Sequence, residues 1–248
     1  MVFETRGFGR VLMLDGVVQA TELDEFIYHE MMTHVPLFAH GAAERVLIIG
    51  GGDGGILREV LRHPLVQATM VELDPDVVAV CREHMPSLSR GAFDDPRARL
   101  LFTDGVRFMA ESTESFDVII VDSTDPIGPG EVLFTESFYA DCRRRLTPGG
   151  ILVTQNGVPL LQPQEMTATA GRLGRLFVDA GFYVAAIPTY VGGFMAMGWA
   201  SDNPALRQQS ERVLAQRFST AGIETRYYTP ALHIASFVLP AYVECLLN

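Results

Sequence analysis

Cysteine is scarce in this sequence, which has only three: Cys81, Cys142 and Cys245. They lie far apart and form no CxxC pair, so they do not indicate a disulfide framework or a zinc site, and they are typical of reduced thiols. Histidine provides no metal motif either, because His29 and His34 are five residues apart, or about 140° around a helix. We expect no bound metal, and we assign surface or structural roles to four histidines: His34, His40, His63 and His84.

Positive charge is also in short supply. The 248 residues carry 19 basic and 30 acidic side chains, a net charge of −11. This balance argues against a nucleic-acid partner, because phosphates would be repelled. The acidic balance suits a cationic ligand, although the charge alone is explained more simply by solubility. No apolar run approaches the ~20 residues of a membrane span, and the first ten residues contain no hydrophobic signal segment. We therefore expect a cytoplasmic protein with no membrane partner.

The chain is long enough for one large domain with a small addition. Two short apolar segments flank Asp15-Gly16, a strong signal for a two-residue hairpin turn. The segment that begins at Thr21 reads as a capping box that opens a helix through about His34, with Pro36 closing it. We therefore expect an N-terminal β-hairpin region over residues 1–21 and a catalytic domain over residues 22–248.

From residue 45 onward, strand and helix patterns alternate. The predicted strands are 46–49, 68–73, 99–103, 116–121, 150–155, 182–187 and 194–200, the last of them antiparallel at an edge. The predicted helices are 56–62, 76–84, 106–110, 136–146 and 163–180. This alternation predicts a doubly wound α/β sheet of about seven strands, which binds ligands beyond the carboxyl ends of its strands.

A glycine-rich loop, Gly50-Gly51-Gly52-Asp53-Gly54-Gly55, follows the first buried strand and opens a helix. Such a loop lets a ligand approach the backbone and the free N–H groups of the helix. Glu72, at the end of the second strand, can accept hydrogen bonds from ribose hydroxyls. The loop fits a nicotinamide dinucleotide or an adenosyl-sulfonium cofactor. Asp53 favours the second, because its carboxylate would repel a pyrophosphate and attract a cationic tail.

Two carboxylates three residues apart, Asp122 and Asp125, end the fourth strand. Aspartates in such positions often cap a turn or helix. However, further acids stand at neighbouring strand ends: Asp53, Glu72, Asp74 and Asp104. So many carboxylates in one cleft would repel one another unless a cation relieved them, so the pattern indicates a polyamine or a metal. Metal is the weaker choice because there is no histidine cluster and no dedicated calcium loop.

Several motifs, in order along almost the whole chain, closely resemble spermidine synthase, a family of polyamine aminopropyltransferases. They are 14–19, 24–32, 50–60, 71–74, 122–129, 188–190, 228–233 and 237–240. Residues 146–153 also resemble the turn into the fifth strand of methyltransferase-like folds. The resemblance implies a methyltransferase-like Rossmann sheet. It also implies transfer of an aminopropyl group from decarboxylated S-adenosylmethionine to putrescine, which gives spermidine and methylthioadenosine.

The same resemblance implies a set of site residues. It makes Asp122 the proton acceptor and puts the amine substrate beside Tyr28, Ser123, Thr124, Asp125 and Tyr190. It puts the nucleoside co-substrate beside the loop residues Gly50 and Gly52 and beside Glu72, Asp104, Gly105 and Pro129, with the aminopropyl amine at His29 and Asp53. It implies no tightly bound cofactor, and a homodimer or homotetramer.

The residue types suit this chemistry. An alkylammonium has a pKa of about 10.4, so at neutral pH it is not a nucleophile until a group such as Asp122 accepts its proton. The sulfonium already makes the adjoining carbon electrophilic, so the protein mainly supplies positioning. The tyrosines at 28 and 190 can line the methylene chain and favour ammonium groups.

Two alternatives stay open at this stage. One is a small-amine N-methyltransferase that uses S-adenosylmethionine, against which Asp53 argues, since the α-carboxylate of that cofactor would meet a carboxylate. The other is a catalytically impaired, polyamine-binding form. Members of this family usually begin with a longer β-strand extension whose glutamine contacts the co-substrate, whereas this sequence starts almost at the hairpin. We expect that contact, and part of the small β-domain, to be missing.

Overall fold

The computed structural model describes residues 1–124 and 128–247. Its main feature is a seven-stranded sheet in the order β6-β5-β4-β7-β8-β10-β9. The strands are β4 (Arg45–Gly50), β5 (Gln67–Glu72), β6 (Ala98–Phe102), β7 (Phe116–Asp122), β8 (Leu146–Gln155), β9 (Asp179–Ala186) and β10 (Phe194–Ser201). β4 pairs in parallel with both β5 and β7. The predicted doubly wound α/β sheet is therefore confirmed.

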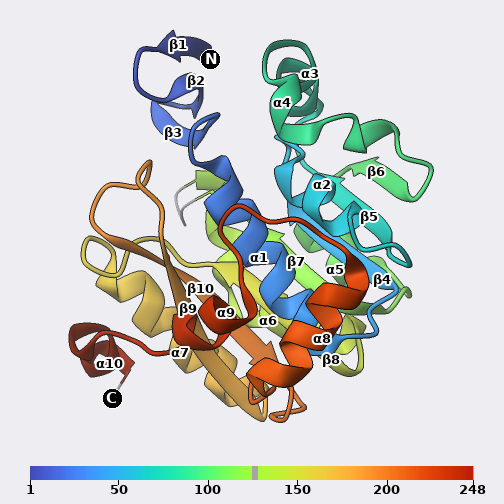
Figure 1. Cartoon of the computed structure of the whole chain (residues 1–248), viewed down its shortest axis with the longest axis vertical. Helices are drawn as coiled ribbons and strands as arrows, with labels where there is room; N and C mark the ends of the chain where they lie inside the picture. The colour runs from blue at the N-terminus through green and yellow to red at the C-terminus, as the bar shows by residue number, and fades with distance from the viewer. Residues whose placement is uncertain (125–127, 248) are drawn as a thin grey trace.

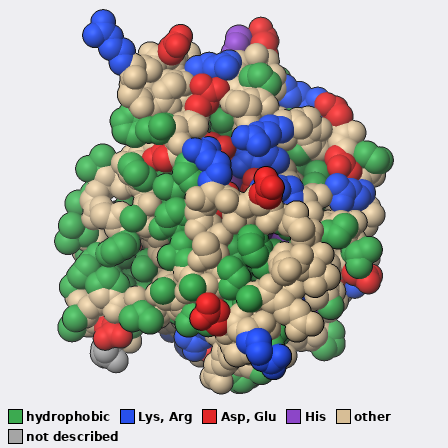
Figure 2. Space-filling view, in the orientation of Figure 1, with side chains coloured by type: hydrophobic (Ala, Val, Ile, Leu, Met, Phe, Trp, Pro, Cys, Tyr) green, Lys and Arg blue, Asp and Glu red, His purple; other side chains and the backbone are tan. Residues whose placement is uncertain are grey.

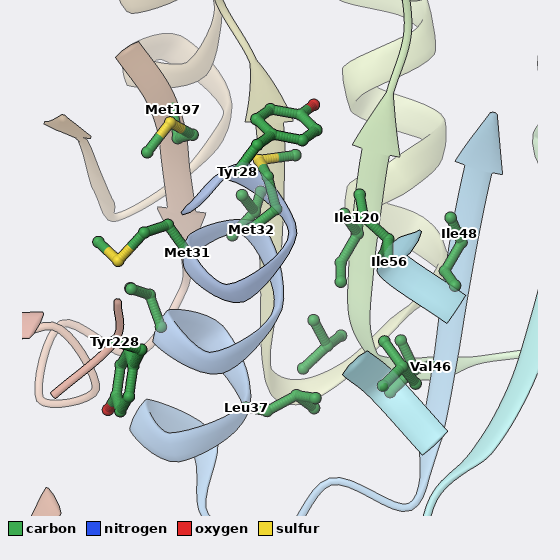
Figure 3. Close-up of a cluster of buried hydrophobic side chains, with 14 of the residues drawn as sticks. Tyr28, Met31, Met32, Leu37, Val46, Ile48, Ile56, Ile120, Met197 and Tyr228 are labelled. Carbon is green, nitrogen blue, oxygen red and sulfur yellow. The ribbon is translucent and has the colours of Figure 1, made fainter. Parts of the chain in front are cut away.

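Two hydrophobic layers cover the sheet because alternate residues of each strand face opposite sides. On β4, Val46 and Ile48 belong to one buried cluster and Leu47 and Ile49 to the other. The first layer contains α1 (Glu25–His40), α2 (Gly55–Leu61), α8 (Glu211–Ala221) and α9 (Pro230–Ser236); the second contains α5 (Gly105–Glu111), α6 (Glu136–Arg145) and α7 (Pro163–Leu176). Figure 3 shows α1 of the first layer packed beside the sheet, with Tyr28, Met31 and Met32 along it.

The remaining elements lie around this core (Figure 1). They are α3 (Pro75–His84), α4 (Pro86–Ser89), the 3₁₀ helices η1 (Ala92–Asp94) and η2 (Gly128–Phe134), and α10 (Ala241–Leu247).

Within the described residues no single helix is long and apolar enough to cross a membrane, and only the bent pair α9 and α10 passes that test together. Figure 2 shows hydrophobic side chains gathered on the side where this pair lies, with Val238 and Tyr242 exposed. All three cysteines are free thiols, and Cys81 and Cys142 are buried.

The N-terminal region is a three-stranded antiparallel sheet of β1 (Val2–Thr5), β2 (Gly9–Leu14) and β3 (Val17–Thr21). The predicted hairpin is present as β2 and β3, with Asp15 and Gly16 at positive φ in its turn. β1 adds a third strand to this hairpin by pairing antiparallel with β2. In Figure 1 this small sheet stands above α1, apart from the large sheet.

The first helix differs from its prediction at both ends. It begins at Glu25, after Asp24, and Thr21 instead donates a hydrogen bond from Oγ1 to Asp24 Oδ1 at 2.6 Å. Pro36 lies inside the helix, which continues to His40 and is followed by Gly41 in the left-handed conformation. The extra turn is held by Arg217, which donates to the carbonyls of Phe38 and Ala39 and so occupies acceptors that a helix end leaves unpaired.

Two further predictions need correction. The helix predicted over 163–180 ends at Leu176, because residues from Asp179 onward form β9. The strand predicted over 194–200 is antiparallel as expected, but it does not lie at the edge. It is β10, it pairs with both β8 and β9, and β9 takes the edge position.

Candidate active site

The carboxyl ends of the parallel strands bring the predicted acids to one edge of the sheet. Gly50 at the end of β4 is the register partner of Asp122 at the end of β7, and Glu72 ends β5 on the other side. The segment around the loop after β4 has room for this arrangement only because Gly50 and Gly55 have no side chain. A Cβ on Gly50 would lie 2.0 Å from the backbone oxygen of Asp122, and one on Gly55 would lie 2.1 Å from the His29 ring.

Asp122 is the most perturbed acid of this edge. Its Oδ1 accepts a hydrogen bond from Tyr28 Oη at 2.5 Å. Burial and the nearby carboxylates of Asp53 and Glu72 raise its pKa to about 7, against the opposing effects of the Tyr28 hydrogen bond and His29. A carboxyl group with such a pKa exchanges its proton near neutral pH, as a general base must.

His29 lies between two carboxylates. Its Nδ1 is 2.6 Å from Glu25 Oε2 and its Nε2 is 3.2 Å from Asp53 Oδ2. Burial alone would lower the pKa of His29, but Asp53 and Glu25 outweigh it and raise the pKa to about 10. His29 is therefore an imidazolium in the free protein. The other oxygen of Asp53 accepts from the backbone N–H of Gly55 at 2.7 Å, at the start of α2.

The predicted nucleoside-binding acids occupy the next two strand ends. Burial raises the pKa of Glu72, which accepts a hydrogen bond from the backbone N–H of Asp74. Gly52 packs close to it, since a Cβ there would lie 2.9 Å from Glu72 Oε2. Asp104 caps α5 by accepting from the N–H of Val106 at 2.8 Å, and Gly105 is the first residue of that helix.

The predicted amine-binding side chains gather around Tyr28. The rings of Tyr28 and Tyr190 meet edge to face with centroids 6.1 Å apart, and Tyr190 Oη donates to the carbonyl of Gln19 on β3. Both tyrosines and His29 line a pocket between β3, α1 and the segment after β9. Ser123 Oγ is buried and has no hydrogen-bond partner among the described residues, whereas Thr124 is exposed. Asp125 and the side chain of Pro129 lie outside the described residues.

Sequence reasoning missed three residues that hold this site together. Glu25 contacts His29, Arg58 pairs with Glu25, and Asp24 accepts hydrogen bonds from both the backbone N–H and the hydroxyl of Thr189, next to Tyr190. A signal for the first existed, since Glu25 and His29 stand four residues apart on one helix. In the described part of the chain, no three His, Cys, Asp or Glu side chains are arranged to hold a metal ion.

The fold and this cluster of acids define a protein of methyltransferase-like α/β architecture with a site suited to cations. Residues 25–210 match the spermine/spermidine synthase domain, and residues 1–22 match the spermidine synthase tetramerisation domain. The chain therefore belongs to the spermine/spermidine synthase family and is an aminopropyltransferase.

Relatives and solved structures agree with this assignment. The chain is 59% identical over 244 residues to polyamine aminopropyltransferase 1 of Pseudomonas aeruginosa, covering 98% of this chain and 85% of the relative. It is 57% identical over 245 residues to polyamine aminopropyltransferase of Escherichia coli O139:H28, with the same coverage. A spermidine synthase in complex with the transition state analogue AdoDATO superposes with a TM-score of 0.94 at 37% identity, covering 99% of this chain and 83% of that one. Spermidine synthase from Thermotoga maritima superposes with a TM-score of 0.90 at 35% sequence identity, covering 99% of this chain and 82% of that one.

Proposed function

We propose that this enzyme transfers the aminopropyl group of decarboxylated S-adenosylmethionine to putrescine, giving spermidine and methylthioadenosine. The observation that carries the proposal is Asp122, a half-buried carboxyl with a pKa of about 7 that meets Tyr28 and adjoins the cation-attracting Asp53. The family's chemistry needs a proton acceptor beside the attacking amine, and this side chain is suited to that task.

In the proposed reaction, the amine nitrogen attacks the propyl carbon next to the sulfonium. The new C–N bond forms as the C–S bond breaks, methylthioadenosine leaves, and Asp122 takes the proton of the amine. Tyr28 and Tyr190 line the methylene chain of the acceptor, and Ser123, Thr124 and Asp125 surround its amino groups. The buried hydroxyl of Ser123, unpartnered within the described residues, supports this assignment, since a ligand would satisfy it.

The co-substrate occupies the glycine loop in this proposal. Glu72 accepts hydrogen bonds from the ribose, and Asp104, Gly105 and Pro129 adjoin the adenine. Gly50 and Gly52 let the nucleoside approach the backbone, and the aminopropyl amine lies at Asp53 and His29. The proximity of Glu72 and Asp53 to Asp122, whose pKa both raise, supports one continuous site.

We also propose a cytoplasmic homotetramer, with residues 1–21 as a separate oligomerisation region and 22–248 as the catalytic domain. The family match over residues 1–22 supports self-association, and the free cysteines fit a reducing compartment. Molecular mass measured by light scattering, with and without residues 1–21, tests the assembly.

The activity is tested by measuring methylthioadenosine release from decarboxylated S-adenosylmethionine with putrescine, cadaverine or spermidine as acceptor. We expect release with putrescine at the highest kcat/KM. Calorimetric titration with S-adenosylmethionine is the matched comparison, because its α-carboxylate would meet Asp53. Tighter binding of that carboxylated form, or methylation of putrescine in place of aminopropylation, contradicts the proposal.

A further inference from the structure

A line of buried charges runs from the active site into the core through His29. It consists of Asp53, His29, Glu25 and Arg58, in that order. His29, Glu25 and Arg58 are all less than one-tenth exposed, and only Asp53 has some contact with solvent. Ion pairs this deep are costly to assemble and do not by themselves indicate stability. The line therefore calls for a functional explanation.

The line fixes which nitrogen of His29 faces the site. Both carboxylate oxygens of Glu25 accept hydrogen bonds from Arg58, at 2.9 and 3.2 Å, and these two bonds fix the orientation of the carboxylate. Arg58 is held in turn by Glu59 at 2.8 Å and by the carbonyl of Leu88. Glu25 therefore stays ionised, with burial outweighed by its partners so that its pKa falls to about 2. Nδ1 of His29 keeps its proton toward Glu25, and Nε2 points to Asp53.

Carboxylates act on His29 from three different segments. Glu25 faces it from α1, Asp53 from the glycine loop, and Asp122 acts on it from β7. Further titratable groups line the same pocket: Asp24, Tyr28 and Tyr190. The α2 backbone closes the last side, because Gly55 packs directly on the ring. In the free enzyme the imidazolium of His29 is thus the cation that neutralises Asp53.

We propose that Glu25, locked by Arg58, positions His29 as a stand-in for the substrate's ammonium group, and that His29 gives up its Nε2 proton when that group binds. This inference rests on the proposed placement of the aminopropyl amine at Asp53 and His29. An arriving ammonium carries the same positive charge to the same carboxylate, and the repulsion between two adjacent cations favours loss of the proton from His29. The released proton goes to solvent. The neutral Nε2 then accepts a hydrogen bond from the ammonium, while Nδ1–H continues to donate to Glu25.

Two thioether nucleosides, one with the aminopropyl ammonium and one without it, test the proposal on the wild-type enzyme. S-adenosyl-3-thiopropylamine has a neutral thioether sulfur and carries the aminopropyl ammonium, whereas methylthioadenosine has a methyl group in place of the aminopropyl chain. With ring-¹⁵N-labelled histidine, we expect the Nε2 signal of His29 to change from a protonated to an unprotonated nitrogen with the first ligand only. A His29→Gln variant assigns the signal.

Calorimetry in buffers of different ionisation enthalpy counts the proton. At about pH 8.5 Asp122 is already ionised and His29 is still protonated, so we expect release of about one proton per site with the aminopropyl ligand and about none with methylthioadenosine. Release while His29 stays protonated would mean that the ligand lost the proton, and it would overturn the proposal. Binding without release would overturn it equally.

The role of Glu25 is tested by Glu25→Gln against Glu59→Gln. Both changes remove one buried carboxylate from Arg58, but only the first touches His29. We expect Glu25→Gln to lower the pKa of His29, so that proton release at the same pH falls to less than half, while Glu59→Gln keeps the wild-type value. Equal proton release in both variants contradicts the positioning role. If Glu25→Gln does not fold, the wild-type titrations still decide whether His29 loses its proton. If the wild-type enzyme forms methylthioadenosine in the activity assay but His29 keeps its proton, the inference about His29 is wrong and the proposed function still holds.

Discussion

Asp122 is subject to opposing influences, because burial and neighbouring acids favour its protonated form while Tyr28 and His29 favour its carboxylate. We predict that Asp122→Asn lowers turnover by about 10²- to 10⁴-fold, the usual contribution of a general base. Binding of methylthioadenosine should change little, because an amide of the same shape remains. Turnover is measured by methylthioadenosine release and binding by calorimetry. Asp117→Asn, at the other end of β7, is the matched control, and near-wild-type turnover of Asp122→Asn would sink the base assignment.

Tyr28 sets the pH at which Asp122 acts. Burial raises the pKa of Tyr28 well above 10, so its hydroxyl stays a donor to the carboxylate and lowers the pKa of Asp122. Tyr28→Phe removes this stabilisation of the charged form. The pKa of Asp122 should then rise, and the acid limb of kcat/KM against pH should move upward by about one unit. Tyr190→Phe is the control, since that hydroxyl binds the carbonyl of Gln19 instead. An unmoved acid limb in Tyr28→Phe would rule out this tuning.

At the scale of elements, Asp24 joins the start of α1 to the segment after β9. Its carboxylate is 3% exposed and accepts hydrogen bonds from Thr21 and from the backbone and hydroxyl of Thr189. We predict that Asp24→Ala releases the segment that carries Tyr190 and raises the KM for the amine by about tenfold, equivalent to about 1.4 kcal/mol. The dissociation constant of methylthioadenosine should not change.

Two variants distinguish positioning of this segment from general stability. Asp24→Asn keeps an acceptor for Thr189 and should restore most of the KM. Glu30→Gln alters another buried acid of α1, one that accepts three backbone N–H groups of residues 226–228. We expect Glu30→Gln to lower stability without raising the KM for the amine. If Glu30→Gln raises this KM as much as Asp24→Ala does, the result argues against a specific role for Asp24.

The elements also show where sequence prediction ends. β4, β5 and β7 were predictable because each is a local apolar run followed by a glycine or an acid. The end of α1 was not, because Arg217, far along the chain, supplies the contacts that let it continue past Pro36. The position of β10 between β8 and β9 depends on long-range pairing. Its unbroken burial from Met195 to Ser201 fits a central strand better than an edge.

At the scale of the whole molecule, the same limit applies to the active site. The acids at strand ends were predictable, since the carboxyl ends of parallel strands share one edge of the sheet. The contacts of α1 with that edge were not. Tyr28 meets Asp122 and His29 meets Asp53 only because the helix crosses the glycine loop at Gly55. Only the family resemblance placed His29 beside Asp53, and it assigned no role to Glu25 or Arg58.

The buried histidines give the free enzyme a predictable dependence of stability on pH. Burial and nearby cations lower the pKa of His63 to about 3 and of His233 to about 4, from 6.5. As pH falls below 6.5, the unfolded chain binds protons at these sites that the folded chain does not, so stability is lost. The contribution of His29 to stability depends on pH in the opposite direction, because its folded pKa of about 10 lies above its ordinary value of 6.5. Its contribution is complete below pH 6.5 and is lost progressively as pH rises toward 10.

These opposing groups predict a maximum of stability near pH 6.5, followed by an alkaline decline of about 1.4 kcal/mol per pH unit for the one proton of His29. Urea unfolding of the free enzyme between about pH 7.5 and 8.5 measures it, because in this range Asp122 is mostly ionised in the folded enzyme and the cysteines of the unfolded chain, with an ordinary pKa of 9.0, are mostly still protonated. His29→Gln should be less stable than the wild type at pH 6.5 but should lose much less stability across that range, because its side chain has no proton to release. His84→Gln, which changes an exposed histidine of α3, should keep the wild-type slope. If His29→Gln retains the full alkaline slope, the imidazolium between Asp53 and Glu25 is not its source.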